Sequence, residues 1–495
     1  MGQEVGGGEW SNQQRQQYRE KVSQNLDVFE RMLSVASFDA GDMTTGMEME
    51  LYLLDEGLHP SIRNKEVLEA IGDESFQSEL AKFNLELNVD PRSIEGDELQ
   101  RLERDLTAAL QRADAAAGTQ GCRLLAVGTC PTIMQQDFGR DSFSEARRYT
   151  ALNDAIMRAR GEDMFIDIHG VTGERLTMYA DSIAPESACT STQLHLQVAP
   201  HEFAAYWNAA QALAGPQVAL GANSPFVCGK QLWHETRIPL YTQSADTRSI
   251  ELVNQGVRPR VGFGDRWITS IFDLFEDNVR YYPALLPEVS DEDPVAVLES
   301  GAPPELAELR LHNGTIYRWN RPIYDTAGGR PHLRVENRVL PAGPSVVDVV
   351  ANAAFYYGAL RFLATEDRPV WTQMSFSAAK TNFRDGARDG MQARLYWPSH
   401  SSVSPDELVL RTLLPMAEEG LSTWGVGREA RDRYLSVIEG RAKSRQNGAT
   451  WQIETVRVLQ DKGLDRADAL HEMLARYLDN AASGQAVHTW ALPAR

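Results

Sequence analysis

Four short stretches of the chain alternate apolar and polar residues with the period of a β-strand, in which residues i and i+2 share a face. The stretches cover residues 46–53, 83–90, 193–198 and 334–339. One face of each stretch is apolar, and the other carries acids, amides, His or Arg. The residues of these polar faces are Glu48 and Glu50, then Glu86, Asn88 and Asp90, then Gln193 and His195, and finally Arg334, Glu336 and Arg338.

The composition of the polar faces indicates more than exposure to water. A half-solvated antiparallel sheet gives the same alternation, so a plain solvated sheet is the alternative interpretation. Solvated strands usually mix Lys, Glu and Thr, whereas these faces combine carboxylates with Gln, Asn and His. The pattern therefore favours a polar sheet floor that binds metal ions and phosphates.

Helical periodicity dominates the rest of the chain. Before residue 400 the apolar spacing predicts helices over 11–37, 98–118, 144–160, 201–213, 265–282 and 345–363. Beyond it the chain is predicted to be almost wholly helical, over 405–419, 427–441, 448–461 and 466–481. Residues 74–82 are predicted to link two strands, and the acidic, proline-containing segment 283–314 to be a surface excursion.

The domain organisation follows from the absence of a convincing linker. We predict a disordered tail over 1–10, a catalytic α+β body over 11–400, and a mostly helical C-terminal portion over 401–495 packed on that body.

Charge and composition limit the partners and the compartment. The formal net charge of −20 argues against nucleic acid as a partner, because phosphate contacts need a basic surface. No apolar run approaches the length of a membrane helix, which is about 18 residues. The N-terminus lacks a signal-peptide pattern, and the four cysteines show no Cys-x-x-Cys spacing. We therefore expect a cytoplasmic protein that binds small molecules, with an oligomeric state that the sequence leaves open.

Several common enzyme signatures are missing from the sequence. It contains no Gly-x-x-x-x-Gly-Lys-Ser/Thr loop, no complete dinucleotide fingerprint, no Gly-x-Ser-x-Gly elbow and no His-Glu-x-x-His helix. P-loop, Rossmann, serine hydrolase and zincin chemistry are accordingly disfavoured.

The acids on the strands are hard oxygen ligands, which suit Mg²⁺ or Mn²⁺ better than zinc. If the strands are not neighbours, each acid simply faces water. Arg is suited to binding phosphate through two hydrogen bonds, although a surface ion-pair ladder would place Arg334 and Arg338 in the same way. Arg237 follows a turn at 223–226 and is a weaker candidate for binding a carboxylate or a phosphate.

Taken in order, these segments resemble the glutamate–cysteine ligase and carboxylate–amine ligase family. The motifs that carry the resemblance are Gly46-x-Glu48-x-Glu50, Glu86 on the next strand, Gln193-x-His195-x-Gln197, Ala222-Asn-Ser-Pro-Phe226 through Arg237, Arg334-x-Glu336-x-Arg338 and Asn382-Phe-Arg-x-x-Ala387-Arg-x-Gly390. The resemblance covers roughly residues 40–460 and rests on the order of the motifs, since none of them is specific alone.

The resemblance implies an α+β fold of the glutamine synthetase and guanidino kinase type, with a curved antiparallel sheet whose polar concave face holds ATP and Mg²⁺ or Mn²⁺. It implies phosphorylation of a carboxylate, usually that of L-glutamate, followed by attack of an amine, usually that of L-cysteine. The implied metal ligands are Glu48, Glu50, Glu86, His195 and Glu336. The implied cofactor-binding residues are Arg334, Arg338, Gln193 and Asn88, and the implied catalytic residues are Arg338 and Arg237. Covering loops that exclude water are expected over 179–189 and 262–267.

The chain departs from the family pattern in two respects. Many relatives show His-x-His where this chain has Gln193 before His195, and the chain is extended at 283–314 and beyond residue 400. A ligase that joins glutamate or another carboxylate to a different amine is therefore an alternative. A phosphotransferase and a non-catalytic nucleotide sensor on the same fold are two others.

Overall fold

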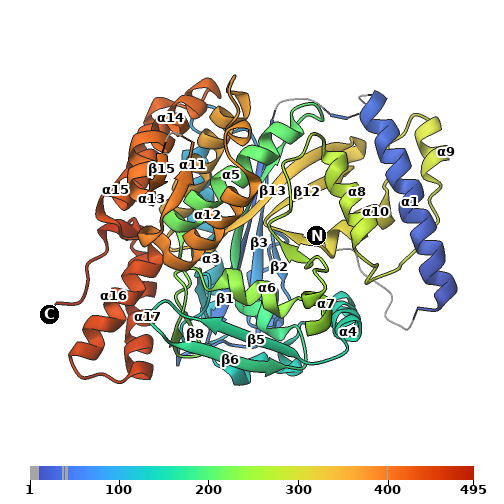
Figure 1. The fold of residues 1–495 in the computed structure, drawn as a ribbon. Helices are drawn as coiled ribbons and strands as arrows, with labels where there is room; N and C mark the ends of the chain where they lie inside the picture. The colour runs from blue at the N-terminus through green and yellow to red at the C-terminus, as the bar shows by residue number, and fades with distance from the viewer. Residues whose placement is uncertain (1–9, 36–37, 40–42, 399, 495) are drawn as a thin grey trace.

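The polar-faced strands lie together in one sheet at the centre of the molecule (Figure 1). The computed structural model describes residues 10–35, 38–39, 43–398 and 400–494, so most of the tail that we predict to be disordered lies outside the described residues. The sheet has seven strands in the order β12-β13-β7-β1-β3-β2, and β4 also pairs with β1. Their bounds are β1 Thr45–Leu54, β2 Phe76–Ser78, β3 Asn84–Arg92, β4 Arg123–Leu125, β7 Ser191–Gln197, β12 Asn320–Asp325 and β13 His332–Pro341.

Every pairing in this sheet is antiparallel. Four small two-stranded sheets lie outside it. They are β5 Met164–His169 with β6 Arg175–Ala180, β8 Phe226–Val227 with β9 Lys230–Gln231, β10 Val261–Gly262 with β11 Tyr317–Arg318, and β14 Leu395–Trp397 with β15 His400–Val403.

Helices surround the sheet, and those beyond residue 400 gather on one side of it (Figure 1). The antiparallel sheet and the helical C-terminal portion predicted from the sequence are confirmed. The helices before residue 300 are α1 Asn12–Val35, α2 Asn64–Ile71, α3 Glu98–Thr119, α4 Arg147–Arg160, α5 Phe203–Gly221, α6 Arg237–Ser244, α7 Ile250–Asn254, α8 Ile271–Tyr281 and α9 Pro294–Glu299. The later ones are α10 Ala307–Gly314, α11 Val346–Thr365, α12 Phe376–Asp389, α13 Pro405–Leu408, α14 Leu414–Thr423, α15 Arg428–Ser444, α16 Gly448–Asp461 and α17 Arg466–Ala482.

Helices α5 and α11 are buried along almost their whole length and cover the apolar face of the sheet. The Tyr357 hydroxyl of α11 lies 3.2 Å from the carbonyl oxygen of Gly46 and 3.0 Å from that of His195, so α11 is seated directly behind β1 and β7. Of the described helices, α11 alone has the length and composition to cross a membrane, and 83% of that apolar window is buried within the protein. The polar residues of the strands therefore face away from this packed layer.

Three elements differ from the sequence-based predictions. Residues 74–82 include β2, which pairs with β3. Helix α5 continues through Pro216 to Gly221, and every residue from Tyr206 onward is buried, so the packing around the helix outweighs the tendency of proline to break it. The segment 283–314 is not only a surface excursion: it contains α9 and α10, and Glu308 of α10 is buried and accepts a hydrogen bond from Asn25 of α1 at 2.8 Å.

Candidate functional site

The strand register aligns the polar residues in rows across the sheet. Glu336 of β13 is opposite His195 of β7, and Glu48 of β1 is opposite Gln193 of β7. On the other side of β1, Glu50 is opposite Glu86 of β3. The interpretation in which the strands are not neighbours is therefore wrong, because β13, β7, β1 and β3 are consecutive in the sheet.

Glu48, His195 and Glu336 form the centre of this surface. One ligand atom from each of them lies within 4.8 Å of the other two. The Nε2 atom of His195 is 3.2 Å from Oε1 of Glu48, yet neither ring nitrogen has a hydrogen-bond partner in the described part of the chain. A buried imidazole whose nitrogens form no well-aligned hydrogen bond, and which faces two carboxylates, fits a divalent cation as a further neighbour.

Two guanidinium groups balance the charge of Glu336, which is fully buried. Arg321 of β12 donates to Oε1 of Glu336 at 2.9 Å and also contacts Oε2, and Arg338 donates to Oε1 at 2.7 Å. Burial opposes ionisation, but Arg321, Arg338 and His195 outweigh it and hold the pKa of Glu336 well below its usual value. Arg338 also donates to the side-chain oxygen of Gln193, which fixes its position over β7.

Glu48 and Glu50 of β1 have opposite electrostatic environments. Burial disfavours the charge on Glu48, but the His195 imidazole stabilises it and lowers the pKa to about 2. Burial raises the pKa of Glu50 to about 7 against the lowering effect of Arg338. Glu50 accepts hydrogen bonds from the backbone and hydroxyl of Ser191 at 2.6 and 3.1 Å and from Gln193 at 2.9 Å. These hydrogen bonds orient a carboxylate whose charge is only partly balanced.

A second group of acids lies beside Glu50. Glu86 accepts a hydrogen bond from Asn88 at 2.9 Å, and it shares another with Glu79, which follows β2. Burial and the repulsion from Glu50 raise the pKa of Glu79 to about 7, and burial and the repulsion from Glu79 raise the pKa of Glu86 well above its usual value. Carboxylates gathered in this way repel one another unless protons or cations are bound.

Arg237 is close to the strands, but its guanidinium is already bound by other groups. It donates to Oε1 of Glu235 at 2.9 Å, to the carbonyl of Arg338 at 3.3 Å and to that of Val339. Arg338 and Val339 lie in a bulge of β13, where the register with β7 shifts. The hydrogen bonds of Arg237 to the two carbonyls therefore hold the bulge of β13 in place. A direct contact of Arg237 with substrate stays a prediction.

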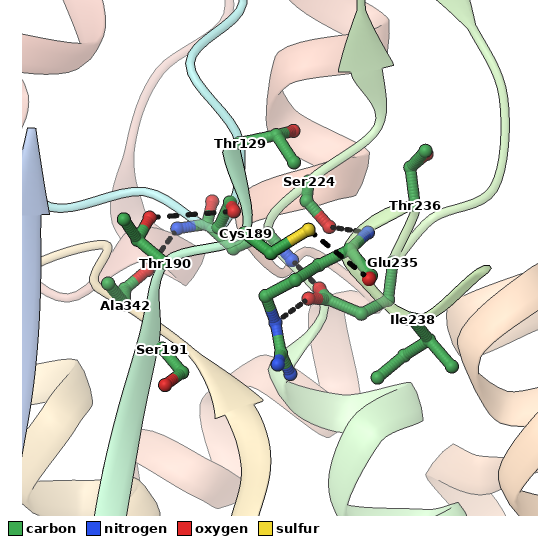
Figure 2. Close-up of polar contacts among 12 residues, drawn as sticks. Thr129, Cys189, Thr190, Ser191, Ser224, Glu235, Thr236, Ile238 and Ala342 are labelled. Carbon is green, nitrogen blue, oxygen red and sulfur yellow. Dashed lines mark hydrogen bonds and ion pairs between the residues drawn. The ribbon is translucent and has the colours of Figure 1, made fainter. Parts of the chain in front are cut away.

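Figure 2 shows Glu235 and Ser224, both of which contact Arg237, close to Cys189, Thr190 and Ser191 at the start of β7. The backbone N–H of Arg237 donates to the Ser224 hydroxyl at 3.2 Å, and the Cys189 thiol lies 3.6 Å from the Arg237 carbonyl. The turn at 223–226 thus positions Glu235 and Arg237, which follow it in the sequence.

Arg334 shares a face of β13 with Glu336 but does not join the central cluster. Its guanidinium lies 3.4 Å from Asp325 and 2.6 Å from the His332 ring. Of the two proposed covering loops, 179–189 is mostly buried from Ser182 onward. The other, 262–267, is anchored by a hydrogen bond from Trp267 to the Met374 carbonyl at 3.0 Å.

Sequence reasoning missed three charged residues of this region. Glu79 follows a strand of only three residues, and such a strand leaves almost no periodic signal. Arg321 lies on β12, where Pro322 interrupts the sequence pattern of a strand. Because β12 is an edge strand, one of its sides has no neighbouring strand that needs backbone hydrogen bonds, and proline is tolerated there. Glu186 lies in a short 3₁₀ segment, Ala184–Ala188, which has no repeating pattern at all.

The site and the fold define a class of protein. Clustered carboxylates beside Arg suit the binding of divalent cations and phosphoryl groups, which are the requirements of phosphoryl transfer. The family model of glutamate–cysteine ligase family 2 matches residues 44–475, and the chain belongs to this family. Family and fold together indicate a carboxylate–amine ligase.

Two ligases are among the solved structures that resemble the chain. Glutamate–cysteine ligase from Francisella tularensis, in complex with AMP, is 13% identical with a TM-score of 0.54, over 92% of this chain and 91% of that one. A bifunctional glutathione synthetase from Pasteurella multocida is 12% identical with a TM-score of 0.51, over 92% of this chain and 55% of that one. At these identities the likeness shows the fold, and the chain spans about half of the bifunctional protein. No curated protein sequence matches the chain.

Proposed function

We propose that the chain is an ATP- and Mg²⁺-dependent ligase that joins the γ-carboxylate of L-glutamate to the amine of L-cysteine and so makes γ-glutamylcysteine. The observation that carries the proposal is the grouping of Glu48, His195 and Glu336 within 4.8 Å, with Arg338 bound to Glu336 at 2.7 Å. Membership of the glutamate–cysteine ligase family and the AMP complex of the Francisella structure support it. The cytoplasm is the expected compartment.

The metal ligands that we propose are Glu48, Glu50, Glu86, His195 and Glu336, with Glu79 as an addition from the structure. When bound, divalent cations would neutralise the triphosphate and hold it in line with the donor carboxylate. In the proposed reaction an oxygen of the donor carboxylate attacks the γ-phosphorus of ATP, and ADP leaves. The amine then attacks the acyl carbon, inorganic phosphate leaves, and one proton is released.

Arg338 is the residue that we assign to the transferred phosphoryl group. Its charge is anchored by Glu336 and its orientation by Gln193, so it is held in place before substrate binds. Gln193 and Asn88 flank the proposed metal ligands, and we assign both to cofactor binding. Arg334 is assigned to cofactor binding as well, but it would reach the nucleotide only by breaking its contacts with Asp325 and His332. In phosphoryl transfer the protein mainly positions the reacting groups and balances their charge, and Arg338, Gln193 and Asn88 have side chains suited to both tasks.

The test is ADP release by the purified protein with Mg²⁺, L-glutamate and a panel of amines, with the product identified by mass spectrometry. The proposal expects ADP release that needs both glutamate and cysteine, together with the mass of γ-glutamylcysteine. ADP release that needs a different amine or a different carboxylate would keep the mechanism and replace the substrate. ADP release without a new C–N bond would indicate a phosphotransferase, and ATP binding without ADP release would indicate a sensor.

A further inference from the structure

In the central cluster of Glu48, His195 and Glu336, the oxygens of Glu336 are already occupied by arginine donors. Arg321 donates to Oε1 at 2.9 Å and to Oε2 through its Nε–H, and Arg338 donates to Oε1 at 2.7 Å. An ionised carboxylate offers about four positions for hydrogen bonds or a cation. Three of these positions on Glu336 are therefore filled by guanidinium N–H groups.

The charge of the central cluster is balanced by the same two arginines. Its two acids, Glu48 and Glu336, are matched by the guanidinium groups of Arg321 and Arg338. The side chains of Glu336 and of both arginines are at most 19% exposed, so water screens their charges only weakly. A divalent cation that enters alone would therefore bring two unbalanced positive charges to a mostly buried place, where both guanidinium groups repel it.

The neighbouring group of acids has no such counter-ions. Glu79 and Glu86 share a hydrogen bond, and neither forms an ion pair with a residue in the described part of the chain. Acids placed in this way attract a cation whether or not a nucleotide is bound, because only protons or cations can offset their repulsion. The two halves of the polar surface therefore differ in the charge that an incoming cation meets.

Of the two arginines on Glu336, Arg321 is the one that can move away. Arg338 has a second partner, because it also donates to the Gln193 side chain. Within the described part of the chain, the guanidinium of Arg321 hydrogen-bonds to Glu336 alone. Arg321 also lies on β12, which is an edge strand of the sheet. Its release from Glu336 would thus break no other hydrogen bond in that part of the chain.

We propose that Arg321 is the internal counter-ion of Glu336, that it leaves Glu336 when the cation of the central cluster binds, and that it passes to the phosphates of the nucleotide. The inference rests on the proposed ATP- and metal-dependent function. Charge then stays balanced at each stage, because Arg321 neutralises Glu336 in the empty site and phosphate in the loaded one. Arg321 thus makes the cation of the central cluster bind together with the nucleotide rather than before it.

The test measures binding by calorimetry for the wild type and for Arg321→Met, which keeps an unbranched side chain and removes the charge. The ligands are Mn²⁺ alone and the complex of Mn²⁺ with a non-hydrolysable ATP analogue. Arg321→Met is expected to bind Mn²⁺ alone about tenfold more tightly or more, because a repelling charge next to the cation is gone. It is expected to bind the Mn²⁺–nucleotide complex about ten- to a hundredfold more weakly, because a charge-assisted hydrogen bond to phosphate is lost.

Three further variants assign the effect. Arg321→Lys keeps the positive charge and is expected to bind Mn²⁺ alone as weakly as the wild type does. Arg321→Met combined with His195→Gln removes a proposed ligand of the central cluster and is expected to lose the gain in Mn²⁺ affinity. Arg428→Met makes the same change on α15, where the arginine side chain is 86% exposed, and is expected to leave both affinities unchanged.

A damaged fold cannot produce a gain in Mn²⁺ affinity, so the expected result has no trivial origin. Unchanged or weaker binding of Mn²⁺ alone by Arg321→Met would overturn the inference. A gain that persists when His195 is replaced would overturn it too, since that gain would belong to another group of acids. So would unchanged binding of the Mn²⁺–nucleotide complex, because Arg321 would then not reach the phosphates.

Failure of the proposed function has a different signature, which is the absence of ADP release by the wild type with any carboxylate and amine. The binding measurements need no turnover, so they decide the role of Arg321 in that case as well.

Discussion

At the scale of single residues, the proposed metal ligands differ in how their charge is balanced. Glu336 is fully buried and lies between Arg321 and Arg338. The Glu48 side chain is 23% exposed and faces His195. Replacing Glu336 leaves the positive charges of Arg321 and Arg338 without their buried partner, whereas replacing Glu48 leaves no arginine unpaired. The two acids therefore offer different tests of the same site.

Glu48→Gln is the cleaner test of metal binding. Because a metal ion contributes several kcal/mol to transition-state stabilisation, we expect ADP release to fall by about a hundredfold or more. Stability should fall by less than in Glu336→Gln, because the Glu48 side chain is partly exposed and the substitution keeps its shape. Steady-state kinetics over a Mg²⁺ titration and a thermal melt measure the two effects.

Glu336→Gln should lose activity as well, but it should also lose about 3–5 kcal/mol of stability through its unpaired arginines. Glu162→Gln, at a half-exposed site, is the matched control. Wild-type turnover by Glu48→Gln at all Mg²⁺ concentrations would contradict the metal assignment.

Two buried histidines, His234 and His312, each contribute a loss of stability in mild acid. Burial lowers the pKa of each to about 4, from an ordinary value near 6.5. Between these values the unfolded chain binds protons at these two groups that the folded chain does not, so their contribution to stability falls as the pH drops from about 6.5 to about 4, whereas Glu50 and Glu79, with pKa values raised to about 7, act in the opposite direction. Each histidine would cost about 3 kcal/mol at the lower limit, at about 1.4 kcal/mol per pH unit.

Urea unfolding of the wild type and of His312→Gln at pH 7.0, 6.0 and 5.0 isolates the contribution of one histidine as the difference between the two slopes. His312→Gln should reduce the proton uptake on unfolding by up to one proton in this range, whatever its effect on stability at pH 7. An unchanged slope in the variant would show that His312 is protonated normally in the folded protein.

At the scale of elements, helices α11 and α14 cross so closely that only glycine fits at the contact. A Cβ atom at Gly420 would lie 1.9 Å from the carbonyl oxygen of Gly358, and one at Gly358 would lie 2.4 Å from that of Ala417. Both contacts are with backbone atoms, which cannot rotate away. Because α11 is seated behind β1 and β7, this crossing supports the strands that carry the site.

Gly420→Ala should therefore destabilise the protein by at least about 1–3 kcal/mol, the usual cost of overpacking. Gly118→Ala is the matched control: this glycine lies near the end of α3 with no atom within 4 Å of the added Cβ. Alanine there should stabilise the protein by about 0.4–1 kcal/mol. Chemical denaturation of both variants measures the difference, and equal effects would refute the close crossing.

At the scale of the whole molecule, a buried chain of hydrogen bonds joins the C-terminal helices to the site. The Tyr477 hydroxyl of α17 donates to the Ala126 carbonyl and accepts from Asn223, both at 2.8 Å. The backbone N–H of Asn223 donates to Glu235 at 2.8 Å, and Glu235 binds Arg237. The portion beyond residue 400 is thus connected through side chains to the bulge that carries Arg338.

Tyr477→Phe removes one hydroxyl from this chain. It leaves the Ala126 carbonyl without this donor and one N–H of the Asn223 amide without an acceptor, which should cost about 1–3 kcal/mol. Because the network joins the two portions, unfolding should stay a single transition shifted to lower temperature when followed by calorimetry. Separate transitions for the body and the C-terminal portion would instead support the predicted boundary at residue 400 as a boundary between independently folding units.

The local periodicity of the sequence determined which residues share a face and where most helices run. Glu48 and Glu50, and likewise Glu336 and Arg338, could be assigned to common strand faces because that relation depends only on backbone geometry within one segment. The helices beyond residue 400 were predictable for the same reason. Membership of the family was also readable from the order of the motifs.

Only the tertiary structure decided which of these faces meet. His195 lies beside Glu48 and Glu336 because strands far apart in the sequence pair in one register, and periodicity within a segment carries no information on that pairing. For the same reason the sequence could not show that Arg237 binds Glu235 and the bulge of β13. Glu186 lies in an irregular segment, whose position is set by packing rather than by any repeating pattern in its own residues.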